Sequence, residues 1–461
     1  MFTLNEIVRI TKGSLVQGNG LAKVRRVSID SRRIRAGDLF VAVKGARYDG
    51  HAFIAAAFRR GAVAALVSSS FQKSVNQSRG LIAVEDPVRA LGLMAREYRR
   101  RFSLPVVAIT GSTGKTTTKE MIACVLKKDF RVLKNPGTEN NQFGVPLTLF
   151  RIQPRYQLLV LELGTNRPGD IAWLAMVSEP DVAVFTNIGE SHLERLGSPR
   201  RVYNEKKTLI SATRPDGTII VNNDDRFLRG IPHQPTKQRC ITYAIERPAC
   251  FQAQAIRPLE HQGWSFNVND RHPFVVKTSA QHNIYNALAA VACARLFHVD
   301  FATIASRLAR SGSMRGRQTV RRKGGVIIID DTYNANPVSF VSALTTLANS
   351  ECHGRRVLVC ADMLELGRQS RQLHIRCGIH AARSGLDAIF GYGPQVRHLI
   401  QAAHKERPQI TASHFRLRRD LHAGILRYCR RGDVCLVKGS RAMAMDQTVA
   451  FLQDKFSSNK G

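Results

Sequence analysis

Short apolar runs alternate along much of the chain with longer segments whose apolar residues recur at helical spacing. After Pro105 these runs end in small or polar residues, and the last of them is followed by a helical stretch at 282–297. The expected strands are VVAI at 106–109, YQLLVLELG at 156–164, VAVFTNIG at 182–189 and GTIIVNNDD at 217–225. Continuous apolar runs are typical of strands that are buried on both faces. Their alternation with helices predicts a parallel sheet with helices on both sides.

Two further segments flank this region. Before it, short apolar runs such as DLFVAVKG and GAVAALVSS are followed by a helical pattern at 86–102. After it, a second alternating unit begins, in which Asn336-Pro337 starts one expected helix and Gly439-Ser440 precedes another. Its expected strands are 325–331, 355–363, 387–393 and 433–439. The pattern therefore predicts an α/β protein of three domains, with bounds at 1–84, 85–313 and 314–461.

The length of 461 residues agrees with several domains, because single hydrophobic cores rarely grow beyond about 250–300 residues. The chain has no apolar run near the ~20 residues that cross a bilayer. Its start, MFTLNEIVRI, lacks the charged and apolar regions of a signal peptide. Nine scattered cysteines indicate neither a disulfide framework nor a zinc site. These features predict a soluble, cytoplasmic protein without a membrane segment.

A formal net charge of +34 raises the hypothesis of nucleic-acid binding, since clustered Lys and Arg side chains displace counterions from phosphates. The basic residues are spread along the chain, in REYRRRF, SPRRVYNEKK, TVRRKGG and FRLRRDL. They are not interleaved with aromatic residues as in single-strand binding platforms. We therefore interpret the charge as a solvated surface that attracts small polyanions, and expect no nucleic-acid partner. A nucleic-acid-dependent ATPase is the alternative from another functional class.

The stretch VVAITGSTGKTTTKEM at 106–121 has the pattern of a strand, a glycine turn and a helix. Backbone N–H groups of such a turn and of the helix start point at one place, where the helix dipole also favours an anion. Lys115 can reach the terminal phosphates of a nucleotide, and the Thr116 hydroxyl can bind Mg²⁺. The loop is shorter than the common phosphate loop, because Ile109 occupies the position of its first glycine. The expected phosphate-binding residues are Gly111, Ser112, Thr113, Gly114, Lys115, Thr116 and Thr117.

Polar residues follow several of the expected strands, where ligands of open α/β sheets collect. Glu162 ends the strand after the phosphate loop, and its carboxylate can complete a Mg²⁺ shell that Thr116 begins. His192 follows the next strand. Because Mg²⁺ prefers oxygen ligands, the residue type alone favours a structural histidine there. Similar positions are held by Asn166, Asn187, Glu190, Asp330, Asp362, Glu365, Lys438, Ser440 and Arg441.

The motifs TGSTGKTTTKEM, NIGESHLE, HNIYNALAA, DDTYNANP and ADMLELG occur in this order, and together they resemble the Mur ligases. The resemblance covers the whole chain. The blocks YNANP, ELGTNRPGDI and TENNQFGVPLTL are similar to those of the member that adds D-alanyl-D-alanine to UDP-muramoyl-tripeptide. Other Mur ligases usually carry a histidine in the block after the aspartate. Another Mur ligase or a folylpolyglutamate-type ligase would share the ATP site, but would differ in the first domain and in the Asn-Ala-Asn block.

This resemblance implies an N-terminal domain that holds the uridine nucleotide, a central ATPase domain and a Rossmann-like C-terminal domain that closes over the site. It implies ATP and two Mg²⁺ ions as cofactors, and UDP-N-acetylmuramoyl-tripeptide and D-Ala-D-Ala as small-molecule substrates. We expect the protein to be a monomer. The implied reaction is ATP-driven amide formation. A substrate carboxylate attacks the γ-phosphate, and the amine of the dipeptide then attacks the acyl phosphate.

The resemblance also assigns residues by position. Ser31, Arg32 and Lys44 would contact the UDP-sugar. Asn140 and Asn141 would lie near the ATP base or substrate, and Asn283 and Asn286 would flank the adenine. Arg317 would face phosphate, Asp331 would bind the ribose, and the substrate would be contacted by Tyr333, Asn334 and Asn336. The implied catalytic residues are Lys115, His192, Lys206 and Arg317.

A second Mg²⁺ would be bound by Glu162, His192 and a carbamylated lysine. A free lysine, with a pKa near ~10.4, would repel the ion, whereas reaction with carbon dioxide makes it an anionic oxygen ligand. Lys206 and Lys207 are both candidates, and the spacing favours Lys206.

Overall fold

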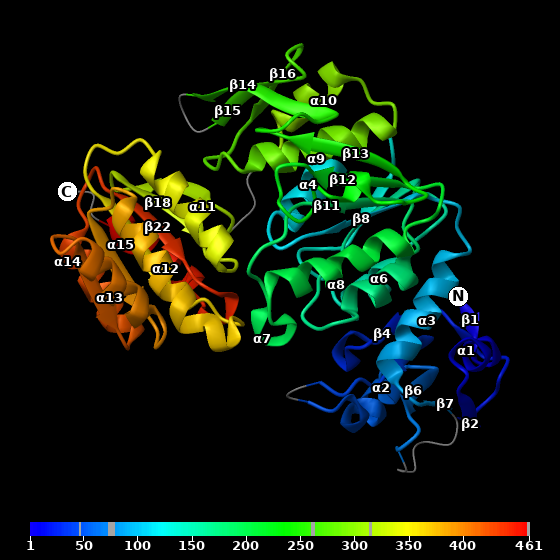
Figure 1. The fold of residues 1–461 in the computed structure, drawn as a ribbon. Helices are drawn as coiled ribbons and strands as arrows, with labels where there is room; N and C mark the ends of the chain where they lie inside the picture. The colour runs from blue at the N-terminus through cyan, green and yellow to red at the C-terminus, as the bar shows by residue number, and fades with distance from the viewer. Residues whose placement is uncertain (46–47, 72–78, 260–262, 313–315, 459–461) are drawn as a thin grey trace.

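The protein consists of three α/β units in chain order, each built around its own sheet (Figure 1). The structure is a computed structural model and describes residues 1–45, 48–71, 79–259, 263–312 and 316–458. The α/β class and the three-unit architecture expected from the sequence are confirmed. Within these residues, none of the helices has both the length and the apolar character that spanning a bilayer requires.

The N-terminal unit has a sheet with strand order β2–β7–β6–β5–β4, in which β4 to β7 are parallel and β2 is antiparallel to β7. The strands are β2 (Ser14–Gln17), β7 (Gly80–Val84), β6 (Ala64–Ser68), β5 (Asp38–Val41) and β4 (Arg26–Ser28). The unit also contains β1 (Phe2–Thr3), which pairs with β3 (Lys23–Val24), and the helices α1 (Leu4–Thr11) and α2 (Ile54–Arg59).

Helix α3 (Pro87–Arg99) connects this unit to the next. The Asp86 carboxylate caps its start, and Pro87 occupies its first turn, where a missing N–H costs no helical hydrogen bond. The helix packs against α1 on one side and against α5 (Gly144–Leu149) and α6 (Asp170–Ser178) on the other. Its Leu91 and Met94 are fully buried. The N-terminal and central units therefore share one hydrophobic core through α3.

The central unit has a nine-stranded sheet of order β16–β15–β14–β13–β12–β11–β8–β10–β9, which is parallel from β9 to β14. Helices α4 (Lys115–Leu126), α9 (Asn283–Leu296) and α10 (Phe301–Leu308) cover one face, and α6 and α8 (Pro199–Ala212) cover the other (Figure 1). The strands are β8 (Val106–Thr110), β9 (Val132–Lys134), β10 (Leu158–Glu162), β11 (Val182–Phe185), β12 (Thr218–Asn222), β13 (Arg239–Ala244), β14 (Phe251–Leu259), β15 (Gly263–Val268) and β16 (His272–Val276).

One part of this sheet departs from the expected alternation of strands and helices. Between β12 and α9 the described residues form four strands, and the helical element among them is a short 3₁₀ turn at Ile231–His233. Strands β15 and β16 are antiparallel additions to the sheet. The sequence pattern missed them because strands such as FQAQAIRPL alternate polar with apolar residues and have one exposed face. The described strands are nonetheless continuous with the parallel core.

The C-terminal unit has a six-stranded sheet of order β17–β18–β22–β19–β20–β21, parallel except for β17. Its strands are β17 (Thr319–Lys323), β18 (Val326–Asp331), β19 (Arg356–Ala361), β20 (Ala388–Tyr392), β21 (Thr411–Phe415) and β22 (Val434–Lys438), and its helices are α11 (Pro337–Ala348), α12 (Ser370–Arg383), α13 (Val396–Glu406), α14 (Arg418–Tyr428) and α15 (Asp446–Ser458). The expected helix start at Asn336-Pro337 is confirmed, since Asn336 and Ser339 form a capping box. The edge strands β17 and β21 were not predicted, because each is partly exposed and lacks an apolar run.

Candidate active site

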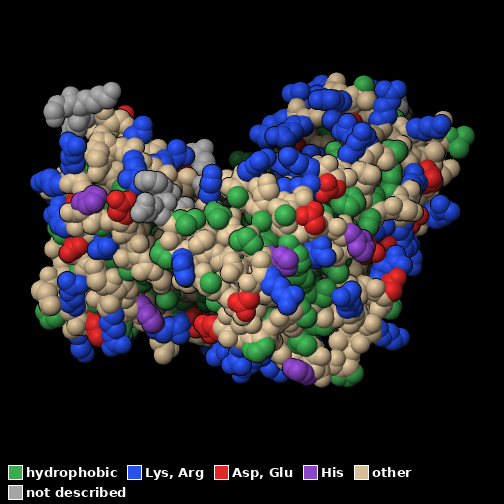
Figure 2. Space-filling model, turned by 90° about the horizontal axis from the view of Figure 1, so that it is seen from above, with side chains coloured by type: hydrophobic (Ala, Val, Ile, Leu, Met, Phe, Trp, Pro, Cys, Tyr) green, Lys and Arg blue, Asp and Glu red, His purple; other side chains and the backbone are tan. Residues whose placement is uncertain are grey.

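A cleft of about 1330 Å³ separates the central unit from the C-terminal unit. The carboxyl ends of β8, β10 and β11 line one side, and those of β18 and β22 line the other. Seen from above, the surface is hollowed between two lobes, and Lys and Arg side chains are spread over both of them (Figure 2). The cleft exceeds the roughly 300–1,000 Å³ of most ligand pockets. It therefore has room for a nucleotide together with a second substrate.

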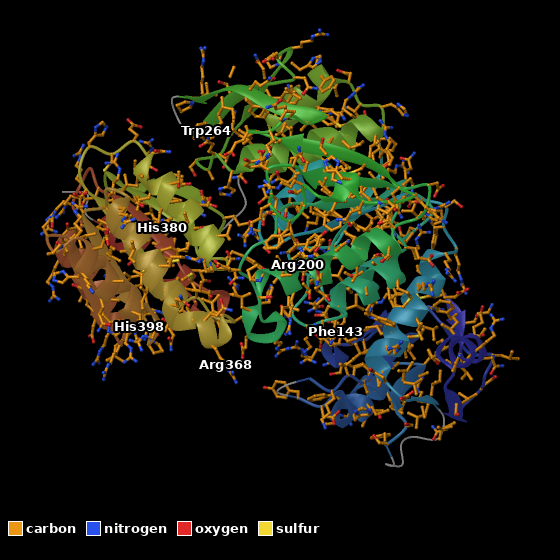
Figure 3. All side chains as sticks on the ribbon, in the orientation of Figure 1. Phe143, Arg200, Trp264, Arg368, His380 and His398 are labelled. Carbon is orange, nitrogen blue, oxygen red and sulfur yellow. The ribbon has the colours of Figure 1, made fainter. Side chains whose placement is uncertain are left out.

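Most residues expected at the site from the sequence meet in this cleft. Those that line it are Ser112, Thr113, Gly114, Lys115, Thr116, Thr117, Asn140, Asn141, Glu162, His192, Asn283, Asn286, Arg317, Asp331, Tyr333, Asn334 and Asn336. Phe143 also lines it, and Figure 3 shows this residue on the side of the central unit that faces the N-terminal unit. The cleft thus extends from the C-terminal unit toward the N-terminal unit.

Among the expected residues, Gly111 and Lys206 do not line the cleft either. Three others lie elsewhere, on the N-terminal unit. Ser31 and Arg32 lie in a 3₁₀ turn, where the exposed Arg32 pairs with Asp30 at 2.9 Å. Lys44 is exposed and forms an isolated bridge with Asp49. None of the three lines the cleft. A ligand that touches both regions must extend over the surface between the two units.

The phosphate loop is shaped by two close approaches at its glycines. Gly111 lies so near Thr186 that a Cβ would be 1.8 Å from the threonine hydroxyl oxygen. Gly114 has a φ of +78°, and a Cβ there would be 2.4 Å from the side-chain oxygen of Asn286. Thr186 Oγ1 also donates to the Thr113 carbonyl at 2.6 Å. Larger residues cannot replace these glycines without moving the loop, so its N–H groups stay directed at the cleft.

Lys115 folds back over this loop, and its Nζ donates to the Gly111 carbonyl at 2.8 Å. Burial lowers the pKa of Lys115, and the nearby Glu162 carboxylate partly offsets this effect. From the C-terminal side of the cleft, Arg317 donates from Nη2 to the Thr116 hydroxyl at 2.8 Å. Its guanidinium also lies 4.2 Å from the ring centre of Tyr333. Two cationic side chains therefore converge on the phosphate loop from opposite sides.

Glu162 is buried at the end of β10. Its Oε1 accepts a hydrogen bond of 2.6 Å from Asn140 Nδ2, whereas its Oε2 has no hydrogen-bond partner in the described part of the chain. A buried carboxylate oxygen without a partner is costly, and a bound cation would remove that cost. Glu162 is therefore suited to bind a hard metal ion.

Lys206 and Lys207 have different surroundings on α8. Lys206 is 1% exposed, whereas Lys207 is half-buried with its ammonium 5.8 Å from the ring centre of Tyr203. Burial, followed by the charge of Lys115, lowers the pKa of Lys206 well below its ordinary value. Lys206 is therefore the lysine of the pair that faces the interior.

His192 lies at the start of α7 (Leu193–Leu196), and its Nδ1 is 2.6 Å from Oε2 of Glu365, which follows β19 in the C-terminal unit. The contact with His192, and then the charge of Arg195, lowers the pKa of Glu365, so its side chain is ionised at neutral pH. No cluster of three or more His, Cys, Asp or Glu side chains suited to a metal occurs among the described residues. A metal site here must also use ligands such as Thr116 or a modified lysine.

Asp331, Asn283 and Asn286 have well-defined partners. Lys438 Nζ donates to Asp331 Oδ2 at 2.6 Å in a buried pair, and to the Asn334 carbonyl at 3.1 Å. Asn286 donates to Asn283 Oδ1 at 2.7 Å. Asn141 has a local role, because its Oδ1 accepts from the Phe143 and Gly144 N–H groups at the start of α5.

Two residues that support the site escaped the sequence reasoning. Lys119 is fully buried on α4, and its Nζ donates to the Asn135 and Gly137 carbonyls at 2.8 and 2.6 Å. Asn135 in turn accepts from the Glu162 N–H at 2.9 Å. Together they fix the loop that presents Asn140 to Glu162. A lysine one helical turn after Lys115 was the only signal in the sequence, and it does not distinguish a buried lysine from a solvated one.

The fold and the site define a three-unit α/β protein with a phosphate loop in a cleft between two of its units. Family models match almost end to end: the Mur ligase family, catalytic domain, over residues 23–99, the Mur ligase middle domain over 109–294, and the Mur ligase, glutamate ligase domain, over 316–441. The chain belongs to the Mur ligase family.

Similar proteins cover nearly its full length. The UDP-N-acetylmuramoyl-tripeptide–D-alanyl-D-alanine ligase of Bacillus subtilis is 33% identical over 97% of both chains, and that of Escherichia coli is 33% identical over 98% of both. Among solved structures, MurF from Acinetobacter baumannii has a TM-score of 0.90 and 29% identity over 98% of this chain and 99% of its own. MurF ligase from Thermotoga maritima in complex with ADP has a TM-score of 0.82 and 31% identity over 94% and 98%.

Proposed function

We infer that this protein is an ATP-dependent ligase that joins D-alanyl-D-alanine to UDP-N-acetylmuramoyl-tripeptide. The product is the UDP-muramoyl-pentapeptide precursor of peptidoglycan. The observation that carries this inference is the full-length similarity to ligases of that name. The matched regions include both sides of the cleft, where the phosphate loop lies opposite the Asn-Ala-Asn block at 334–336. The block resembles the one that distinguishes this ligase from other Mur ligases.

The reaction activates a carboxylate before the amide bond forms. A carboxylate oxygen of the tripeptide attacks the γ-phosphorus of ATP, the bond to the β–γ bridging oxygen breaks, and ADP leaves. The dipeptide amine then attacks the carbonyl carbon of the acyl phosphate, inorganic phosphate leaves, and the amine loses a proton. Lys115 and Arg317, which reach the phosphate loop from opposite sides, stabilise the charge that develops on the transferred phosphoryl group. Closure of the C-terminal unit over the cleft would limit hydrolysis of the acyl phosphate.

The residues of the cleft fit Mg²⁺. Thr116 and Glu162 would hold one ion, and Glu162, His192 and a carbamylated Lys206 a second; the unpartnered Oε2 of Glu162 supports this assignment. Bound Mg²⁺ would neutralise charge on the phosphates. Lys206 suits carbamylation, because burial lowers its pKa and a neutral amine is the form that reacts with carbon dioxide. In that step the lysine nitrogen bonds to the carbon of carbon dioxide and releases one proton.

The remaining roles follow the expected positions. Asn283 and Asn286 flank the adenine, and Asp331 takes the ribose while Lys438 fixes its carboxylate. Tyr333, Asn334 and Asn336 contact the incoming dipeptide or tripeptide. Asn140 orients Glu162 beside the substrate, with Asn141 holding the adjacent helix start. Ser31, Arg32 and Lys44 bind the uridine nucleotide on the N-terminal unit.

The proposed domains are 1–84 for the UDP-sugar, 85–313 for ATP and 314–461 for ligation. Support for the first bound is that β7 ends at Val84 and α3 begins at Pro87. The second bound falls in 313–315, outside the described residues. We further propose that the protein acts as a cytoplasmic monomer without a nucleic-acid partner. The spread of Lys and Arg over both lobes supports the last point (Figure 2).

The test is ADP release by the purified protein with ATP, Mg²⁺ and UDP-N-acetylmuramoyl-tripeptide, with and without D-Ala-D-Ala. We expect ADP in amounts equal to a pentapeptide product identified by mass spectrometry, and only when both substrates are present. A parallel assay replaces them with single-stranded DNA or RNA over a salt series. ADP release that depends on nucleic acid and not on the peptide substrates would overturn the proposed function.

A further inference from the structure

Glu365 and His192 meet across the cleft although 173 residues separate them in the chain. His192 belongs to the central unit and Glu365 to the C-terminal unit. The imidazole is largely buried, at 20% exposure, whereas the carboxylate is about half exposed, at 52%. This pair therefore exists only when the two units are docked as they are here.

Both residues adopt a backbone conformation that non-glycine residues rarely populate. His192 has a φ of 54° and Glu365 a φ of 62°. Such conformations persist where the surrounding structure holds them, and they concentrate at functional sites. Here the surrounding contacts join the two units: the Glu194 N–H donates to the Glu365 carbonyl at 3.0 Å, and a Cβ on Gly367 would lie 2.8 Å from Glu194 Cα. The two loops thus press together at the point where the side chains meet.

The contact determines what the His192 ring can do. The Glu365 carboxylate lies against Nδ1 and accepts the hydrogen bond of the Nδ1–H group, so Nε2 is the ring nitrogen that is available to a metal ion. Histidines that bind metals commonly donate their other ring N–H to a carboxylate, which fixes the ring orientation and makes the ligating nitrogen more basic.

We propose that Glu365 is a positioning residue, supplied across the cleft, that orients His192 for metal binding and so makes the second metal site complete only when the C-terminal unit is docked. This inference rests on the proposed function, because it takes His192 as a metal ligand. It adds a residue of the opposite unit that touches no substrate and acts through His192. Metal affinity is then coupled to docking of the two units.

Other contacts at the same edge hold the units together without Glu365. Arg376 on α12 pairs with Glu190, and Gln369 Nε2 donates to the Gly197 carbonyl at 3.0 Å. Gln369 directly follows Arg368, which Figure 3 shows at the end of the C-terminal unit that approaches α7. Removal of the Glu365 side chain should therefore disturb the ring of His192 more than the docking itself.

The experiment is a Mn²⁺ titration of the full-length, ADP-bound protein, followed by electron paramagnetic resonance. Spin-echo modulation from a coordinated imidazole nitrogen reports on His192 directly. The variants are Glu365→Ala, Glu365→Gln, His192→Ala and the double variant Glu365→Ala/His192→Ala. The matched control is Glu406→Gln, which removes a similar carboxylate that pairs with Arg383 inside the C-terminal unit. Circular dichroism confirms that each variant is folded.

We expect Glu365→Ala to weaken the His192-dependent Mn²⁺ affinity roughly 10-fold or more and to reduce the nitrogen modulation. Glu365→Gln should lie between Glu365→Ala and the unmodified protein, and Glu406→Gln should behave as the unmodified protein. The double variant should bind no more weakly than His192→Ala, because Glu365 acts only through that ring.

If His192→Ala weakens binding and Glu365→Ala does not, this inference alone is overturned. If His192→Ala itself leaves affinity and modulation intact, the proposed metal site is also wrong.

Discussion

Lys438 and Asp331 form a buried ion pair of 2.6 Å at the ends of the neighbouring strands β22 and β18. Lys438 is 1% exposed and Asp331 is 9% exposed, so water solvates neither charge well. The pair connects the expected ribose-binding carboxylate to a lysine that lies 107 residues further along the chain. Its role in stability can therefore be separated from its role in nucleotide binding.

We expect Asp331→Ala to lower the free energy of unfolding by about 3 kcal/mol, because the Lys438 ammonium would remain buried without its counter-ion. The same change should raise the KM for ATP. Urea unfolding and ATP dependence measure the two effects. The double variant Asp331→Ala/Lys438→Met should regain much of the stability but not the ATP affinity. Unaltered unfolding of Asp331→Ala would mean that the ion pair is absent in solution.

Replacing Lys115 by Ala should abolish ATP turnover and leave the fold intact. Within the described part of the chain, the hydrogen bonds of this ammonium go to the loop carbonyls of Gly111 and Ser112. Its loss therefore removes charge facing the γ-phosphate without removing core packing. A loss of about 100-fold or more is typical for a group that stabilises transition-state charge. Lys128→Ala, which changes an exposed lysine just after α4, is the control. Turnover at the control's rate in Lys115→Ala would contradict the assignment of the loop.

Lys206→Ala should be nearly inactive, whereas Lys207→Ala should stay active, because only Lys206 faces the interior. A short-chain carboxylic acid in solution should restore part of the activity of Lys206→Ala, since it supplies the oxygen ligands of the lost carbamate. A carbon-13 carbamate signal from labelled carbon dioxide, present in the unmodified protein and missing in Lys206→Ala, would identify the modification. If the two variants behave the opposite way, Lys207 is the modified residue.

The stability of the protein should depend on pH through His282, which precedes α9. Its Nδ1 lies 2.5 Å from the Ser342 hydroxyl oxygen on α11, and burial, with the charge of Lys438 second, lowers its pKa to about 4. The unfolded chain binds a proton at this residue near its ordinary pKa of ~6.5, so it holds more protons than the folded chain between these values. The stability contributed by the neutral ring is therefore lost as the pH falls from about 6.5 to about 4.

Urea unfolding at pH 6.5 and at pH 4.5 measures this effect. The loss of stability on acidification should be smaller in His282→Gln than in the unmodified protein. His380→Gln, which changes an exposed histidine on α12 (Figure 3), should show the full loss. Equal losses in His282→Gln and His380→Gln would show that His282 titrates as it does in the unfolded chain.

The parallel core of the central unit could be predicted because its strands are buried on both faces and leave a simple signal. The residues from Val106 to Thr110 are all buried, and this continuous apolar run is enough to predict a strand from the sequence. The glycines of the phosphate loop were also predictable, since the turn restricts residue type as well as spacing. Edge strands such as β21 are half exposed and carry mixed residues, so their pairing depends on a neighbour that the local sequence does not reveal.

Contacts between residues far apart in the chain could not be predicted. The sequence placed His192 and Glu365 each at the end of a strand, but nothing local indicates that these two ends meet. Lys438 was similarly recognised as a strand-end residue, while its pairing with Asp331 follows from strand order, which places β22 next to β18. The choice between Lys206 and Lys207 rested on family spacing, and only burial distinguishes the two side chains.

The position of β22 also affects how the protein is made. This strand lies in the middle of the C-terminal sheet, between β18 and β19, although it is the last strand of the chain. During synthesis, the two earlier strands leave the ribosome without the partner that joins them. The N-terminal and central units can fold while the ribosome is still translating, whereas the ligation half of the site must wait until residues 434–438 emerge. A nascent chain that stalls before this strand would therefore carry a nucleotide pocket but no completed C-terminal sheet to close it.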